Sequence, residues 1–545
     1  MLVISTYYCD TARKALPYRG DRGLDRGRSF TLECKAGGNG LASAFGGAAM
    51  SFRSPDIAVV PRHPVIIGDK LLERGSGNLQ RHVYPANGRT TCEISLASPQ
   101  DVDHAVQAAR AALPAWRALP GDKRRDLMFR MATVIEQHAK ELAELSTLEN
   151  GSPSLMASFI PADGAQKFRY FGGWADKIQG ETISAWSGPA HNYVAYEPYG
   201  VIGAIIPWNG PLFAATMVMT PALAAGNCIV VKAPELAPFT VMRLGELFLE
   251  AGFPAGVVNM VAGGPDIGEA MVKHPGIDKI QFVGSGGTAK KVLRTAAETL
   301  KPCGLELGGK SAVIVFADAD LQEASRRGLS GAISVSGQGC VNGTRLLVER
   351  PIYEQYLKML QAIAAHIKVG DPLDSSTIMG PIISEASVQR ILGVIDTAIN
   401  KDRARLVLGG KRLGGDYAEG YFLPLTIIAD VDNKTSLAQY EVFGPVLAVT
   451  PFDTEEEAIA LANSTSYGLG AYIHTQNLRR AHYVASQMQA GMVQVNASGE
   501  GMQPFAPFGG MKQSGYGRLG GQEGLHEFLQ VKNVWMNLAK PQAAT

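Results

Sequence analysis

The sequence predicts an α/β protein built around a doubly wound parallel sheet. From residue 201 to residue 316, short apolar runs bounded by glycine or proline alternate with segments of helical periodicity. The composition suits a packed fold, since 46% of the 545 residues are hydrophobic and 19% are charged. Glycine is in excess at 62 residues, which indicates many turns and close backbone approaches. In such a sheet, ligands are expected at the carboxyl ends of the strands.

A helical region precedes the alternation. Residues 101–118 and 122–148 place apolar side chains at helical spacing, which predicts two long helices. Pro99 and Pro120 mark their starts, because proline is tolerated in the first turn of a helix.

The alternation itself defines the sheet. Residues 201–206 form an apolar run ending at Pro207, which predicts a strand, and the helix that follows stops at Gly226. By the same reasoning, strands are expected at residues 228–232, 257–261, 279–283 and 312–316, and helices at residues 212–225 and 240–251. Two extended runs around Ser187, Gly188 and Pro189 predict a hairpin over residues 177–199.

Charge and hydropathy exclude two classes of partner. The 51 basic and 50 acidic residues leave a net charge of +1, which provides no field to attract a nucleic acid. Residues 201–231 carry no charge and are long enough to cross a bilayer. Pro207, Pro211, Pro221 and Gly226 interrupt this segment, so a buried strand, loop and helix are expected instead of a membrane span.

The cysteines and the N-terminus bear on the cellular compartment. The six cysteines show no CxxC pair, which predicts neither a metal site nor a disulfide framework. No secretory signal pattern is present, so we expect a cytoplasmic protein. Residues 1–60 lack apolar periodicity and predict a loosely ordered extension. An open alternative is that translation starts near Met50.

Three residues are candidates for catalysis. Cys340 is flanked by glycines, which would let a carbonyl substrate reach its sulfur, although a buried inert cysteine is the alternative. Glu306 lies between two leucines, where desolvation would make it a general base; the alternative is a turn carboxylate. Asn209 follows a strand end and could donate to an oxyanion, or simply form a turn.

Two strand ends are candidates for nucleotide binding. Lys232 and Glu235 stand at the end of one strand, where a carboxylate could hold ribose hydroxyls. Gly284, Gly286 and Ala289 follow another strand with loose GxGxxA spacing, which could expose backbone N–H groups to a phosphate. An ordinary strand-to-helix turn is the alternative.

Taken in order, these segments resemble the motifs of the aldehyde dehydrogenase superfamily, NAD(P)-dependent and hydrolytic, from about His63 to Val534. The matching segments are Pro207-Trp208-Asn209 (PWN), Glu306-Leu307-Gly308-Gly309 (ELGG), Gly337 to Cys340 (GQxC), Glu441 to Pro445 (ExFGP) and Pro507 to Arg518 (PFGGxKxSGxGR). The resemblance implies an aldehyde dehydrogenase-like fold, with a doubly wound cofactor domain, an α/β catalytic domain and a small oligomerisation hairpin. The boundaries expected are 1–60 for the extension, 61–176 and 199–306 for the NAD-binding domain, 307–524 for the catalytic domain, and 177–198 with 525–545 for the oligomerisation element.

The resemblance also implies a role for each residue. Cys340 would attack the aldehyde, Asn209 and the Cys340 backbone N–H would hold the oxyanion, and Glu306 would activate water. NAD is expected rather than NADP, because Glu235 would repel a 2′-phosphate. The residues expected to bind the cofactor are Ile206, Trp208, Lys232, Glu235, Gly264, Gly284, Ser285, Leu307, Glu441 and Phe443. The implied partners are a small-molecule aldehyde and, for assembly, a homodimer or homotetramer.

The sequence departs from the family pattern at several positions. Ala289 stands where the phosphate loop of the family often has a glycine. Near the active site, Gly210 and Ser334 stand where the family has aromatic residues, and Val335 stands where it has an asparagine. Losing two bulky side chains predicts a wider entrance, which Phe213, Met217, Met502 and Phe508 would keep apolar. We therefore expect a bulky hydrophobic or aromatic aldehyde as substrate. The alternatives are a CoA-acylating enzyme, which the retained Glu306 disfavours, and a non-catalytic protein with this fold.

Overall fold

A computed structural model of the protein describes residues 52, 57–186, 188–499 and 501–539. The chain divides into two units, Met1–Ser51 and Phe52–Thr545, and every helix and strand named below lies in the second. Most of the predicted extension, Met50 and Ser187 of the hairpin turn lie outside the described residues.

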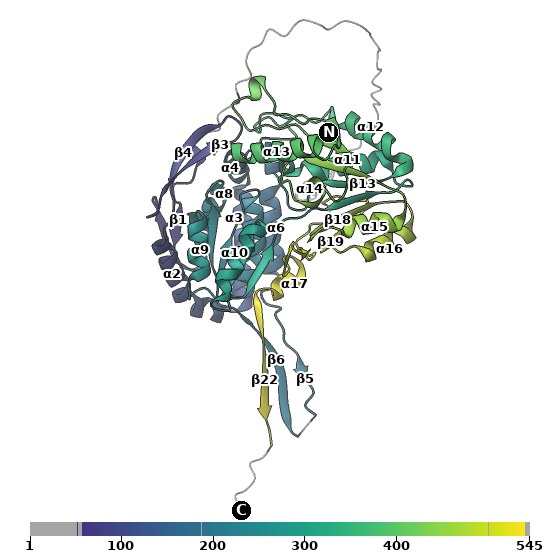
Figure 1. The fold of residues 1–545 in the computed structure, drawn as a ribbon. Helices are drawn as coiled ribbons and strands as arrows, with labels where there is room; N and C mark the ends of the chain where they lie inside the picture. Colours follow the sequence, from purple (N-terminus) through teal and green to yellow (C-terminus); the bar gives the residue numbers. More distant parts are fainter. Residues whose placement is uncertain (1–51, 53–56, 187, 500, 540–545) are drawn as a thin grey trace, which may run out of the picture. The chain divides into compact units, whose positions relative to one another are not determined.

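The first sheet has eight strands in the order β2-β1-β9-β8-β7-β10-β11-β21 (Figure 1). Its five central strands are parallel, and β1, β2 and β21 pair antiparallel at the two edges. The order confirms the predicted doubly wound arrangement. The strands are β1 Val65–Ile67, β2 Lys70–Leu72, β7 Val201–Ile205, β8 Cys228–Pro234, β9 Val258–Gly263, β10 Lys279–Val283, β11 Cys303–Glu306 and β21 Gly515–Tyr516.

Helices cover both faces of this sheet. α2, α9 and α10 pack on one side, and α7 and α8 pack on the other, backed by α3, α4 and α6. Their bounds are α2 Pro99–Ala118, α3 Gly121–Gln137, α4 Ala139–Asn150, α5 Ser154–Ala157, α6 Ile160–Gly172, α7 Pro211–Ala224, α8 Phe239–Glu250, α9 Pro265–Lys273 and α10 Gly286–Ala297. The uncharged segment of residues 201–231 forms β7, α7 and the start of β8, whose side chains are buried except for the half-buried Phe213. Among the described residues, no helix is long and apolar enough to cross a membrane.

One predicted helix is wrong in its continuity. Residues 122–148 form α3 and α4, which are separated at His138 (φ −99°, ψ 14°). The His138 side chain bonds Glu141 at 2.9 Å and Glu250 at 3.1 Å, which ties the junction to α8. The apolar periodicity continues across this break, so the sequence pattern could not reveal it.

The second sheet has seven strands in the order β14-β15-β16-β13-β12-β18-β19, all parallel except β14 (Figure 1). Its strands are β12 Ala312–Val315, β13 Arg345–Glu349, β14 Arg405–Leu408, β15 Thr426–Ala429, β16 Val446–Phe452, β18 Gly470–His474 and β19 Met492–Val495. Its helices are α11 Leu321–Ile333, α12 Tyr353–Ala364, α13 Glu385–Asn400, α14 Ser436–Gln439, α15 Glu455–Asn463 and α16 Leu478–Gln487.

A third sheet, β22-β6-β5, joins the predicted hairpin to the C-terminal strand (Figure 1). β5 (Thr182–Ile183) and β22 (Leu529–Asn537) both pair antiparallel with β6 (Ala190–Pro198). Exposed apolar side chains include Val531 and Trp535 on β22 and Trp186 in the loop between β5 and β6. The remaining elements are η1 Ile57–Val59, β3 Leu79–Tyr84, β4 Arg89–Ser95, η2 Ser334–Gly337, η3 Arg350–Ile352, η4 Gly415–Tyr417, β17 Tyr467–Gly468, β20 Met511–Lys512 and α17 Gly521–His526.

Candidate active site

The predicted cofactor residues lie at one edge of the first sheet. Each of the five parallel strands β9, β8, β7, β10 and β11 ends at or directly before one of them. Because parallel strands have their carboxyl ends at the same edge, these residues form one row. In sheet order they are Gly264, Glu235, Ile206, Gly284 and Leu307.

The N-terminus of α10 is open to a ligand. Ser285 caps this helix by accepting a hydrogen bond from Thr288 N at 3.3 Å. A Cβ atom built on Gly286 or Gly287 would meet no atom within 4 Å, so space lies beside these backbone N–H groups. The position suits a phosphate. Ala289 is 1% exposed and its methyl group packs in the core, one turn inside the helix.

A buried lysine and a carboxylate face each other beyond β8. Lys232 Nζ lies 3.3 Å from Glu235 Oε2, and burial lowers the pKa of this lysine. Gly268 on α9 lies against Lys232 and Ile205, with room for only a small residue. Gly264, with extended backbone, is the N-cap residue of α9. The pair therefore offers one donor and one acceptor group, as the hydroxyls of a ribose require.

Aromatic and acidic side chains from the two sheets meet beside this row. The Trp208 and Phe443 rings are in an edge-to-face contact with centroids 5.4 Å apart. Phe443 has φ +52°, an uncommon conformation for a residue other than glycine. Glu441 Oε1 accepts a hydrogen bond from Gly309 N at 3.0 Å, and burial raises the pKa of Glu441 to about 7.

Cys340 follows η2 in a tightly held loop. Val335, Ser336 and Gly337 have successive φ values of +52°, +54° and +79°. Residues that carry a side chain rarely adopt such positive φ values. A Cβ atom on Gly337 would also collide with the backbone of Gly444. Tyr472 holds the other side of the loop by donating to Val341 O at 2.8 Å. The position of Cys340 is thus fixed by the close approach of the Gly444 backbone and by the hydroxyl of Tyr472 on β18.

The surroundings of Cys340 do not lower the pKa of its thiol. Burial, followed by the negative charges of Glu441 and Glu306, raises this pKa to about 12. A nucleophilic cysteine is expected to have a lowered pKa, and the structure gives the opposite direction.

Asn209 lies next to the cysteine loop. Its Nδ2 donates to Gln338 O at 2.8 Å, two residues before Cys340. Asn150 at the end of α4 donates to the carbonyls of Trp208 and Asn209 at 3.3 and 3.4 Å and holds their segment. An amide and a thiol are thereby brought together from two segments 131 residues apart.

Glu306 is the last residue of β11 and is 3% exposed. Neither of its carboxylate oxygens has a hydrogen-bond partner among the described residues. Burial raises the pKa of Glu306 well above its usual range, and the positive charge of Arg518 opposes this effect. A buried carboxylate with free oxygens has the properties expected of a general base.

The predicted apolar residues at the entrance are all buried or half-buried. Met217 is 6% exposed and Phe508 8%, and Phe213 and Met502 pack partly against the core. The wall behind them is charged, which the sequence did not indicate. Lys167 on α6 is buried, forms an ion pair with Asp163, and holds its ammonium 3.6 Å from the centre of the Phe213 ring. One face of Phe213 is thus covered by a cation.

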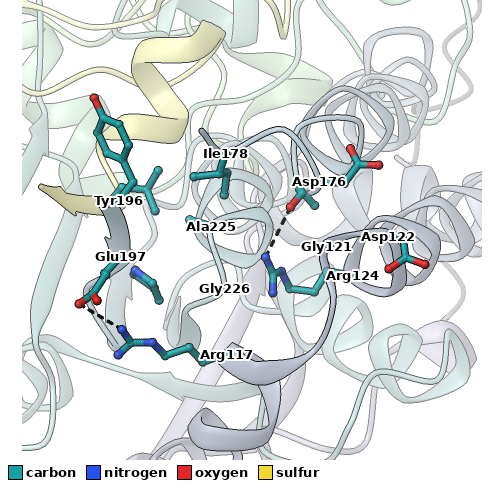
Figure 2. Close-up of a pocket in the computed structure, with 13 residues that line it drawn as sticks. Arg117, Gly121, Asp122, Arg124, Asp176, Ile178, Tyr196, Glu197, Ala225 and Gly226 are labelled. Carbon is teal, nitrogen blue, oxygen red and sulfur yellow. Dashed lines mark hydrogen bonds and ion pairs between the residues drawn. The ribbon is translucent and has the colours of Figure 1, made fainter. Parts of the chain in front are cut away.

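A separate pocket of about 570 Å³ lies at the base of the third sheet (Figure 2). Arg117 pairs with Glu197 at 3.1 Å on one wall. On the other, Arg124 donates to the carbonyls of Leu119 and Ala175. None of the predicted catalytic or cofactor residues lines this pocket. We therefore place the candidate active site at Cys340, Glu306 and Asn209, because of the chemistry of these residues. The volume of this separate pocket does not identify it as the active site.

The structure adds supporting residues that sequence reasoning missed. Ser514 accepts from Gly468 N and donates to Gly308 O, which ties the C-terminal glycine motif to the residues after Glu306. Asn150 likewise holds the segment of Trp208 and Asn209, and Tyr472 holds the loop of Cys340, each by donating to a backbone carbonyl. Their partners are backbone atoms, which leave no pattern in the sequence. No cluster of three or more metal-ligating side chains occurs in the described part of the chain.

Comparison with known proteins agrees with this geometry. Residues 73–534 match the aldehyde dehydrogenase family. Retinal dehydrogenase 2 from Homo sapiens is 38% identical over 480 residues, which cover 87% of this chain and 92% of that protein. The crystal structure of PnpE from Pseudomonas sp. WBC-3 in complex with nicotinamide adenine dinucleotide has a TM-score of 0.86 and 39% identity, covering 89% of this chain and 99% of PnpE. The NAD+ complex of Bacillus cereus aldehyde dehydrogenase has a TM-score of 0.86 and 38% identity over the same shares. This chain therefore belongs to the aldehyde dehydrogenase family and is an NAD-dependent oxidoreductase acting on aldehydes.

Proposed function

We propose that this enzyme oxidises a bulky hydrophobic or aromatic aldehyde to the carboxylic acid through a thioester on Cys340. The observation that carries the proposal is the meeting of three groups from separate segments. The Asn209 amide bonds the cysteine loop, and the charge of the buried, unpartnered Glu306 acts on the Cys340 thiol.

In the first half of the reaction, the Cys340 sulfur forms a bond to the aldehyde carbon and the thiol loses its proton. Because the surroundings raise the pKa of this thiol, proton removal must accompany the attack. Glu306 is the adjacent carboxylate with free oxygens and accepts the proton, directly or through water. Asn209 Nδ2 and the Cys340 backbone N–H then donate to the oxyanion. NAD, when bound, supplies the acceptor for the hydride that leaves the substrate carbon.

In the second half, Glu306 activates a water molecule. Before this half, Glu306 releases the thiol proton to solvent. The water oxygen then bonds to the thioester carbon while Glu306 takes one of the water protons, and as the carbon–sulfur bond breaks Glu306 passes that proton to the sulfur, which releases the acid and the Cys340 thiol. The competing reaction is acyl transfer to CoA, which does not require a base at this position. The buried Glu306 supports hydrolysis over that alternative.

The residues proposed to hold NAD fit its parts. Lys232 and Glu235 suit the adenosine ribose, and the N-terminus of α10 after Gly284 and Ser285 suits the pyrophosphate. Trp208 with Phe443 suits the nicotinamide ring and Glu441 its ribose. Glu235 would lie where NADP carries its 2′-phosphate and would repel it, which supports NAD over NADP. The other proposed contacts are Ile206, Gly264 and Leu307.

The proposed substrate preference rests on missing side chains. Gly210 and Ser334 leave space where the family has aromatic residues, and a Cβ atom on Gly210 would meet only the Phe213 side chain at 3.8 Å. Met217, Met502 and Phe508 provide apolar surface. A wide apolar entrance stabilises a large hydrophobic substrate in proportion to the area that it buries.

An aldehyde panel tests the function directly. With NAD, we expect kcat/KM for benzaldehyde or a terpenoid aldehyde to exceed that for acetaldehyde and betaine aldehyde by about 10-fold or more, since each buried methylene contributes ~0.8 kcal/mol. Product analysis with and without CoA should yield the free acid in both cases. A highest kcat/KM for acetaldehyde would contradict the substrate proposal, and a product formed only as the CoA thioester would contradict hydrolysis.

We also propose a cytoplasmic homodimer or homotetramer. The third sheet supports the assembly, because it presents exposed apolar side chains, Trp535 at 47% and Val531 at 67%, next to unpaired strand edges. Light scattering on the full chain should give two or four times the monomer mass. Val531→Lys combined with Trp535→Lys should lower that mass, whereas the same change at exposed Leu300, outside this sheet, should leave it unchanged. A monomeric mass for the wild-type protein would refute the assembly.

A further inference from the structure

The C-terminal glycine motif brings an arginine to the catalytic base. β21 pairs antiparallel with β11, so that Gly515 lies opposite Glu306, and the chain then continues to Arg518. A Cβ atom on Gly509 would lie 2.8 Å from Glu306 Oε1 and 2.9 Å from Arg518 Cδ. Glu306 and Arg518 therefore converge on Gly509, whose lack of a side chain keeps the space between them open.

The Arg518 guanidinium is held by other partners. Nη1 donates to Gly510 O at 2.9 Å and to Gly517 O at 2.7 Å, and no hydrogen bond joins it to Glu306. A direct ion pair would occupy the carboxylate oxygens that must accept protons. A cation fixed nearby by backbone carbonyls stabilises the ionised carboxylate and leaves both oxygens free.

A buried ion pair holds the Arg518 turn in place. Glu527, at the end of α17, accepts from the Arg518 backbone N at 3.3 Å and from Lys279 Nζ at 2.6 Å. Both side chains of the Lys279–Glu527 pair are largely buried, with exposures of 5% and 15%. The pair therefore fixes the turn that contains Arg518 against β10, which is the strand next to β11.

We propose that Arg518 is a positioning residue that favours the ionised form of the general base Glu306 without binding it, and that Lys279 and Glu527 hold Arg518 in place. The inference rests on the proposed role of Glu306. The charged groups that act on Glu306 come from separate elements: Arg518 after β21 and Glu527 after α17, while Lys279 of β10 acts through Glu527. The titratable thiol of Cys340, after η2, is in turn affected by Glu306. Arg518 is the cation among them whose charge acts on Glu306 and whose side chain reaches Gly509 beside the Glu306 carboxylate.

The test measures thioester hydrolysis apart from thiol attack. The full-length enzyme is mixed with NAD and excess benzaldehyde, and the steady rate that follows the NADH burst is recorded against pH. In Arg518→Gln the midpoint of this profile should rise by ~1–2 pH units, because removing a nearby opposite charge favours the neutral carboxyl. At pH 7 hydrolysis should fall by about 10-fold or more and recover at higher pH, while Arg518→Lys should keep the wild-type midpoint within ~0.5 unit.

The matched control is Arg124→Gln. Arg124 is also a buried arginine that donates to two backbone carbonyls, but it lies at the base of the third sheet. It should change the melting temperature without moving the midpoint. In an enzyme carrying Glu306→Gln, adding Arg518→Gln should produce no further shift.

Two results would overturn the inference: an Arg518→Gln midpoint equal to that of the wild type, or an Arg518→Lys midpoint raised as much as that of Arg518→Gln. Both would leave Arg518 with a structural role alone. Failure of the proposed function looks different, because then the wild-type enzyme itself would form no carboxylic acid after its NADH burst.

Discussion

Cys340→Ser should lose aldehyde oxidation by a factor on the order of 10⁴ to 10⁶, because the hydroxyl is a far weaker nucleophile than the thiol in the same place. The surroundings that raise the pKa of the thiol to about 12 would also keep a serine hydroxyl protonated. NADH formation measured under single-turnover conditions reports the loss. The substitution removes no hydrogen bond that holds the loop, since Gln338 and Val341 are held through their own carbonyls.

The control for this variant is Cys303→Ser. Cys303 is another free, partly exposed cysteine, on β11 three residues before Glu306. It should retain activity within about 3-fold, and NAD binding measured by calorimetry should be unchanged in both variants. Turnover of Cys340→Ser close to that of the wild type would show that another residue is the nucleophile.

Glu306→Gln should slow thioester hydrolysis by about 10²–10⁴-fold, the usual contribution of a general base. Glutamine matches glutamate in size and fills the same buried site at the end of β11, so the fold should persist. If Glu306 also accepts the thiol proton, the NADH burst will slow as well, but less than hydrolysis, because water can take that proton. Rapid-mixing kinetics separate the two phases, and mass spectrometry should detect the acylated enzyme.

The control is Glu419→Gln, which removes an exposed carboxylate paired with Arg89. Its burst and its steady rate should both match those of the wild type. A steady rate in Glu306→Gln equal to that of the wild type would assign water activation to another group, and Glu441, with a pKa near 7, would be the next candidate.

Several features of the fold and of the site could be predicted from the sequence, and others could not. The ends of the central strands follow from apolar runs stopped by proline, glycine or a charge, and these strand ends suffice to place Ile206, Glu235 and Gly284 in one row. The spaced motifs identify the family, because each retains reactive residue types in a fixed order. The break at His138 could not be predicted, since the apolar periodicity continues across it and the contact with Glu250 that accompanies it lies over 100 residues away.

The sequence predicted the desolvation of Glu306 but not the electrostatics around Cys340 and Phe213. The raised pKa of Cys340 depends on burial and on the charges of Glu441 and Glu306, which are distant in the chain. The cation over Phe213 comes from Lys167 on another helix.

The order of residue types and the local apolar periodicity were therefore enough to predict the fold class, the family and the candidate catalytic residues. The pKa shifts of those residues depend on burial and on charges from distant segments, and the approach of Arg518 to Glu306 across Gly509 arises only when β21 pairs with β11. The reason is physical: a pKa is set by solvent exclusion and by charges within a few ångströms, and neither quantity exists until the chain has folded.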